Sequence, residues 1–97
     1  MEIAVTGRSS DGLDERRRRL LFRSWHRGIR EVDLVLGRFA DATLATMSAT
    51  ELDDYERLLE VPTPELLAVV MGEVPIPDDE TGPLLRRMID FHSNIKT

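Results

Sequence analysis

Residues 29–44 carry the periodicity that most limits how this chain can fold. Their apolar side chains recur at spacings of three and four, which places them on one face of an α-helix. No Asn-Gly or Asp-Gly hairpin separates alternating runs anywhere in the chain, so no strand is predicted. The residues of this face are Ile29, Val32, Val35, Leu36, Phe39 and Thr43. The segment therefore favours an all-α fold.

Local signals start and stop two further helices. Ser48 and Glu51 match a capping box, in which each side chain bonds the other residue's backbone N–H, so a helix is expected to begin there. That helix should end before Pro62, which restricts the residue ahead of it. Thr63 then predicts the N-cap of a short helix that Gly72 terminates.

Helices are also expected at both ends of the chain. One should begin near Asp14 and stop at Gly28, and the last should begin at about residues 81–83. Short connections favour antiparallel packing of neighbouring helices. We predict a flexible N-terminal arm over residues 1–12 and a small, compact five-helix bundle over residues 13–97.

The amino-acid composition argues against disulfide-bonded, membrane-spanning and nucleic-acid-binding proteins. With 97 residues the chain forms one small domain, and its lack of cysteine excludes disulfides and thiol chemistry. No apolar run approaches the roughly 18 residues that cross a bilayer, and residues 1–11 do not resemble a targeting signal. We therefore expect a cytoplasmic protein with no membrane insertion. The net charge of −5 argues against nucleic acid as a partner.

Charge is distributed unevenly along the chain. Residues 1–40 carry nine arginines and six acids, whereas residues 41–97 carry four basic residues and twelve acids. The densest cluster is Arg16 to Arg19, and four consecutive helical residues point around most of the helix circumference. This cluster is either a solvated helix surface or a docking surface for an acidic protein.

Catalytic and metal-binding patterns are weak, and we expect no enzyme activity. His26 and His92 lie far apart and neither has a partner ligand at helical spacing, so no metal site is predicted. The acidic clusters at residues 53–56 and 78–80 are expected to be solvated. No glycine-rich loop follows a strand to hold a dinucleotide.

The segment Arg27-Gly28-Ile29-Arg30-Glu31 joins two predicted helices and admits two interpretations. As a helix junction, Gly28 would take a left-handed conformation, and Glu31 would favour the positive end of the next helix. As a docking corner, Arg27 and Glu31 would project together toward a partner while the glycine permits close approach. Spacing does not distinguish the two.

Here the chain resembles the succinate dehydrogenase assembly factors of the SdhE type. The resemblance is carried by Arg27-Gly28-x-x-Glu31, which fits the RGxxE motif of that family, and extends from about Leu13 to His92. It departs from the family pattern in the fourth helix, which lacks an aromatic residue over residues 67–70. Further matching positions are Trp25, Phe39, Tyr55, Arg57, Leu58, Leu59 and Pro64.

The resemblance implies a chaperone-like assembly factor with a five-helix fold. Such proteins bind the flavoprotein subunit of succinate dehydrogenase, with fumarate reductase as a further possible client, and promote covalent attachment of FAD to it. The factor itself would hold no cofactor stably, and FAD would reside on the client. By position, Arg27, Gly28, Arg30 and Glu31 would contact the partner. We expect a monomer when the protein is free.

The alternative function is a generic helical adaptor or regulator. It would bind its partner through the arginine cluster at residues 16–19 rather than through the RGxxE turn. Loss of a co-purifying partner on neutralising that cluster would favour the adaptor.

Overall fold

The structure is a computed structural model that describes residues 12–96, so the predicted arm lies outside the described residues except for Gly12. The described part is all-α, as predicted, and contains five α-helices and one short 3-10 helix. They are α1 (Glu15–Trp25), α2 (Arg30–Thr43), η2 (Leu44–Thr46), α3 (Ala49–Glu60), α4 (Thr63–Val70) and α5 (Gly82–Lys96).

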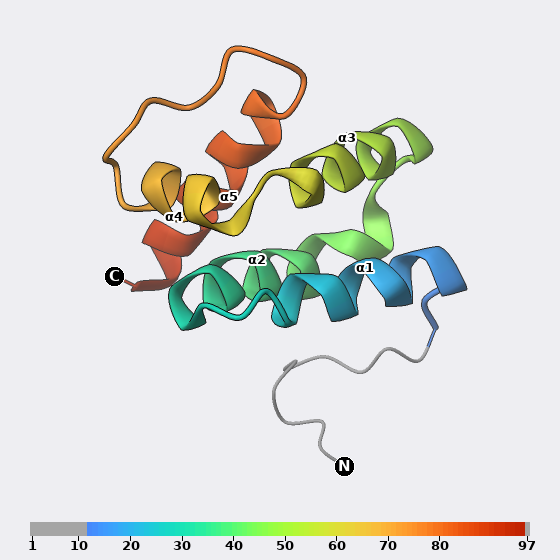
Figure 1. Cartoon of the computed structure of the whole chain (residues 1–97). Coiled ribbons are helices and arrows are strands. Elements are labelled where there is room, and N and C mark those ends of the chain that lie inside the picture. The colour runs from blue at the N-terminus through green and yellow to red at the C-terminus, as the bar shows by residue number, and fades with distance from the viewer. Residues whose placement is uncertain (1–11, 97) are drawn as a thin grey trace.

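The helices pack around α2. Figure 1 shows α1 and α2 side by side and joined by a tight turn, with α3 on the other side of the core. Helices α4 and α5 also pack against α2, and α5 reaches α3. No helix among residues 12–96 is long and apolar enough to cross a membrane. Helix α2 contacts α1, α4, α5 and the 3-10 helix.

The local start and stop signals are confirmed. Asp14 caps α1 by accepting a hydrogen bond from the backbone N–H of Arg17 at 2.8 Å. Both hydrogen bonds of the Ser48 and Glu51 capping box are present at the start of α3. Gly72 follows α4 with φ of 78°, the left-handed conformation that glycine adopts without strain.

The start of α4 differs from the prediction by one residue. Thr63 is the first helical residue rather than the cap, and Pro62 occupies the cap position in an extended conformation. The carbonyl of Pro62 accepts the N–H groups of Glu65 and Leu66 at 3.0 and 3.1 Å. The helix therefore begins without a side-chain cap, and proline 64 lies in its first turn.

One buried polar pair ties α1 to α3 inside the core. The hydroxyl of Tyr55 lies 2.5 Å from that of Ser24, and both side chains are fully buried. Ser24 also donates to the carbonyl of Leu20 at 2.7 Å. Burial raises the pKa of Tyr55, so its phenol stays protonated and able to donate. The largest apolar side chains around this pair are Leu20, Leu36, Phe39, Leu44, Leu58, Leu59, Leu66, Leu85 and Met88.

A second contact sets the distance between α1 and α2. Trp25, the last residue of α1, lies over Gly37 of α2. A Cβ built on Gly37 would fall 2.2 Å from the indole ring, closer than real atoms approach. The missing side chain therefore makes room for the indole next to the turn that joins the two helices.

Candidate functional site

The turn between α1 and α2 carries the predicted site residues. Helix α1 ends at Trp25 with His26 as its C-cap, and Ile29 caps α2 in an extended conformation. Gly28 has φ of 98°, so the expected left-handed conformation is confirmed. It lies two residues beyond the C-cap, because α1 ends earlier than the sequence indicated.

Gly28 is the exposed point of this turn. No atom lies within 4 Å of the position that a Cβ would occupy there. A side chain at this residue would therefore meet open space, but its backbone would be strained at a φ that other residues rarely adopt. The turn thus presents a stretch of backbone that another protein can approach closely.

Arg27 points into the molecule, which differs from the projecting side chain of the docking-corner interpretation. Its guanidinium donates to the carbonyl of Leu59 at 2.6 Å and to that of Val61 at 2.7 Å. These are carbonyls at the end of α3, where a helix leaves acceptors unsatisfied and where positive charge is favoured. Arg27 therefore fastens the turn to the C-terminus of α3.

The backbone of Arg27 is fixed as well. Its N–H donates to a carboxylate oxygen of Asp33 at 2.7 Å. Asp33 lies in the first turn of α2, and the turn folds back over its carboxylate. Partial burial lowers the pKa of Arg27, although a guanidinium remains charged throughout the physiological range. The conformation of the turn is thus held from both the backbone and the side chain.

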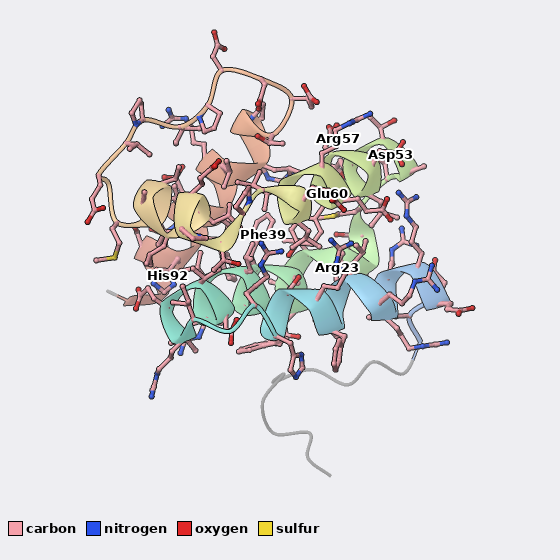
Figure 2. The ribbon with its side chains drawn as sticks, viewed as in Figure 1. Arg23, Phe39, Asp53, Arg57, Glu60 and His92 are labelled. Carbon is pink, nitrogen blue, oxygen red and sulfur yellow. The ribbon has the colours of Figure 1, made fainter. Side chains whose placement is uncertain are left out.

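Arg30 and Glu31 begin α2 and differ in their surroundings. Arg30 is exposed. Glu31 is 42% exposed at its side chain, and its carboxylate lies 3.8 Å from Nε2 of His92 on α5. Figure 2 shows His92 at the end of the molecule where α2 begins. The predicted site residues therefore share one turn, with Arg27 directed inward and Gly28 and Arg30 outward.

A pocket of about 260 Å³ lies next to Glu31. We call it the α2–α4–α5 pocket, after the helices that supply or adjoin its lining. It is lined by Glu31, Val35, Val70, Met71, Ile89, His92 and Ser93. Sequence reasoning missed it, because its lining comes from segments up to 62 positions apart in the chain. The one local signal for it is the spacing of His92 at three and four residues from Ile89 and Met88, which places the histidine beside apolar residues of one helix face.

The arginine cluster at residues 16–19 is partly engaged within the domain. Arg16 pairs with Asp53 at 2.7 Å and with Glu56 at 2.9 Å, both on α3. Arg17 donates to the carbonyls of Leu44 and Met47 across the fold. Two of the four arginines therefore stabilise the bundle, which weakens the adaptor alternative that relies on this surface.

The remaining candidates for chemistry are held in structural contacts. Nδ1 of His26 lies 2.7 Å from the carbonyl of Phe22, and the two rings stack with centroids 3.9 Å apart. Among residues 12–96 no group of three histidine or acidic side chains is arranged to hold a metal ion. The RGxxE turn itself presents exposed backbone at Gly28 and an exposed charged side chain at Arg30.

Comparison with known proteins agrees with this geometry. The family described as "Flavinator of succinate dehydrogenase" (Sdh5) matches residues 18–92, which include the whole turn. No solved structure matches the chain.

Named relatives come from bacteria and from mitochondria. The chain is 45% identical over 87 residues to the FAD assembly factor SdhE of Acetobacter pasteurianus, covering 90% of this chain and 80% of that protein. It is 44% identical over 62 residues to the mitochondrial succinate dehydrogenase assembly factor 2 of Debaryomyces hansenii, covering 64% and 44%. For the Dictyostelium discoideum protein of the same name the identity is 31% over 80 residues, covering 82% and 56%. This chain thus spans less than two thirds of both mitochondrial relatives but belongs to the family of succinate dehydrogenase flavinators.

Proposed function

We propose that this protein binds the flavoprotein subunit of succinate dehydrogenase and promotes the covalent attachment of FAD to that subunit. The observation that carries the proposal is the family match, because it spans the exposed Arg27–Glu31 turn. The names of the relatives, an FAD assembly factor and a succinate dehydrogenase assembly factor, point to the same client.

The proposed mechanism is differential binding. The factor binds most tightly when the client holds its flavin and the acceptor side chain in the orientation needed for reaction. By binding that state it raises the population that reacts, and it needs no catalytic group of its own. A preformed turn suits this role, because little ordering entropy is lost when the complex forms.

Each residue of the turn has a separate part in this proposal. Arg27 positions the turn by holding it to the end of α3. Gly28 lets the client approach the backbone, since no side chain intervenes. Arg30 and Glu31 supply the two charged side chains that reach the client.

The test is covalent flavin on the client, read as in-gel fluorescence after denaturation. The client is produced together with the intact factor or with Gly28→Arg or Glu31→Ala. Gly12→Arg is the matched control, because Gly12 also has a positive φ, of 87°, and open space around it, but lies before α1. We expect strong labelling with the intact factor and with the control, and weak labelling with the two turn variants.

Equal labelling in all four samples would contradict the proposal. Weak labelling with Gly12→Arg as well as Gly28→Arg would assign the loss to backbone strain rather than to the turn. Circular dichroism of each purified variant shows whether the helical content is unchanged.

We also propose that the free factor is a cytoplasmic monomer with FAD held by its client rather than by itself. The name of the bacterial relative, an FAD assembly factor, supports the part of this proposal that places FAD on a client. Sedimentation of the purified chain at several concentrations, with its absorbance near the flavin bands, tests the oligomeric state and the location of FAD. A dimer, or a flavin that sediments with the isolated chain, would contradict them.

A further inference from the structure

The α2–α4–α5 pocket has apolar walls and three polar groups, which are the carboxylate of Glu31, the imidazole of His92 at 3.8 Å from it, and the hydroxyl of Ser93. Val35 forms its base and is 1% exposed, whereas Met71 at its edge is 57% exposed. Val70 and Ile89 are partly buried and complete the apolar lining. A cavity of about 150 Å³ is enough to hold benzene, so 260 Å³ has room for one large side chain.

The electrostatics of the pocket favour a positive charge. No arginine or lysine among the side chains described in residues 12–94 forms an ion pair with Glu31. By contrast, Asp53 and Glu56 on α3 are both paired with Arg16. Glu31 lies in the first turn of α2, where an acidic side chain complements the positive end of the helix.

Two helix ends add to this preference. Val70 is the last residue of α4 and Met71 is its C-cap, so the end of that helix borders the pocket. His92 and Ser93 belong to the final two turns of α5. The last carbonyls of a helix carry partial negative charge, which attracts cations.

Few types of side chain match both the apolar walls of the pocket and its preference for a positive charge. A lysine or arginine has an aliphatic stem that packs on apolar surface and a cationic head that seeks a carboxylate. Here the stem would contact the walls at Val70 and Ile89, and the head would meet Glu31 at the rim. Met71 can adjust to the shape of the stem, since its side chain is unbranched and flexible.

We propose that the α2–α4–α5 pocket receives a basic side chain, lysine or arginine, from the flavoprotein client. This inference rests on the proposed function, and it extends the contact surface from the turn to α4 and α5. Glu31 belongs to both the turn and the pocket, so one surface of the client can engage the two together.

The test fills the pocket without removing a core contact. Ser93 is exposed and lines the pocket, so Ser93→Trp places an indole in it. Asn94→Trp is the control, because residue 94 is also exposed but does not line the pocket. Binding to the purified, flavin-free client is measured by calorimetry, and we expect Ser93→Trp to weaken it at least tenfold while Asn94→Trp changes it less than about twofold.

A second pair of variants tests the charge. Glu31→Gln keeps the size of the side chain, and Glu65→Gln removes an equal charge at the exposed first turn of α4, away from the pocket. We expect Glu31→Gln to weaken binding and to reduce its dependence on salt, whereas Glu65→Gln binds as the intact protein does.

Each outcome separates this inference from the proposed function. An intact factor that fails to bind the client removes both. If the intact factor binds and Gly28→Arg does not, but folded Ser93→Trp binds normally, the pocket inference is overturned and the proposed function stands. Self-association of the intact chain that Ser93→Trp abolishes would show that a second copy occupies the pocket, which also overturns it.

Discussion

Replacement of Arg27 by methionine tests how the turn is held. Methionine keeps much of the aliphatic stem but removes the guanidinium, so the carbonyls of Leu59 and Val61 lose their donors. Hydrogen bonds from a charged donor contribute about 1.5–3 kcal/mol each when buried. Because Arg27 is only partly buried, water can replace some of this, and we expect a loss of about 2 kcal/mol for the two bonds together.

That loss is large for a domain of this size. A chain of 97 residues has an unfolding free energy of about 10 kcal/mol at a typical 0.1 kcal/mol per residue. The midpoint of thermal unfolding should fall by about 10 °C, since each kcal/mol shifts a domain of this length by about 4–8 °C. Urea denaturation followed by circular dichroism gives the free energy directly, and the m-value should not change.

Two further substitutions make this prediction specific. Arg19→Met removes an exposed arginine whose ion pair to Glu15 at 3.0 Å is solvated, so the expected loss is below about 0.5 kcal/mol. Arg27→Lys should fall between the two, because a single ammonium cannot reproduce the planar fork of a guanidinium. An Arg27→Met protein no less stable than Arg19→Met would refute the assignment of Arg27 to the end of α3.

Three other predictions concern the bundle itself. Gly37→Ala should lower the unfolding free energy by about 1–3 kcal/mol in urea, because its Cβ would lie 2.2 Å from Trp25; unchanged stability would mean that the indole moves aside at no cost. Tyr55→Phe should lower the unfolding free energy by about 1–2 kcal/mol in the same assay, because it removes the hydrogen-bond partner of the Ser24 hydroxyl. Unchanged stability would mean that this hydrogen bond does not contribute to the stability of the fold. The hydrogen bond from the backbone N–H of Ser48 is the largest cause that lowers the pKa of Glu51 in the folded protein. The ionised carboxylate therefore stabilises the fold above the unfolded pKa of about 4.3, and this contribution is lost as the pH falls through the lower folded pKa. Between about pH 6 and pH 3 Glu51→Gln should therefore lose less stability than the intact protein, and equal losses would remove Glu51 from the acid response.

The sequence predicted those features that depend on residues close together in the chain. The capping box at Ser48 and the end of the fourth helix before Gly72 are set by bonds within five positions, and both are confirmed. The position of Gly28 in a turn follows from the same local rules. The helices and their order could therefore be derived without knowing how they pack.

Contacts between distant segments could not be predicted in the same way. Arg27 reaches carbonyls 32 and 34 positions away, and spacing alone gave no sign that α3 would end beside it. The α2–α4–α5 pocket likewise exists only once three helices have docked. An arginine in a turn looks the same in sequence whether it faces solvent or a helix end.

The glycine beneath Trp25 has a consequence for how the client meets this protein. The indole fits over α2 only at Gly37, because the neighbours on the same helix face, three and four residues away at positions 33, 34, 40 and 41, all carry side chains. The two helices that bracket the turn are therefore keyed in a single register. A client docking here meets a surface whose shape is already set, and its own domains are the parts that must adjust.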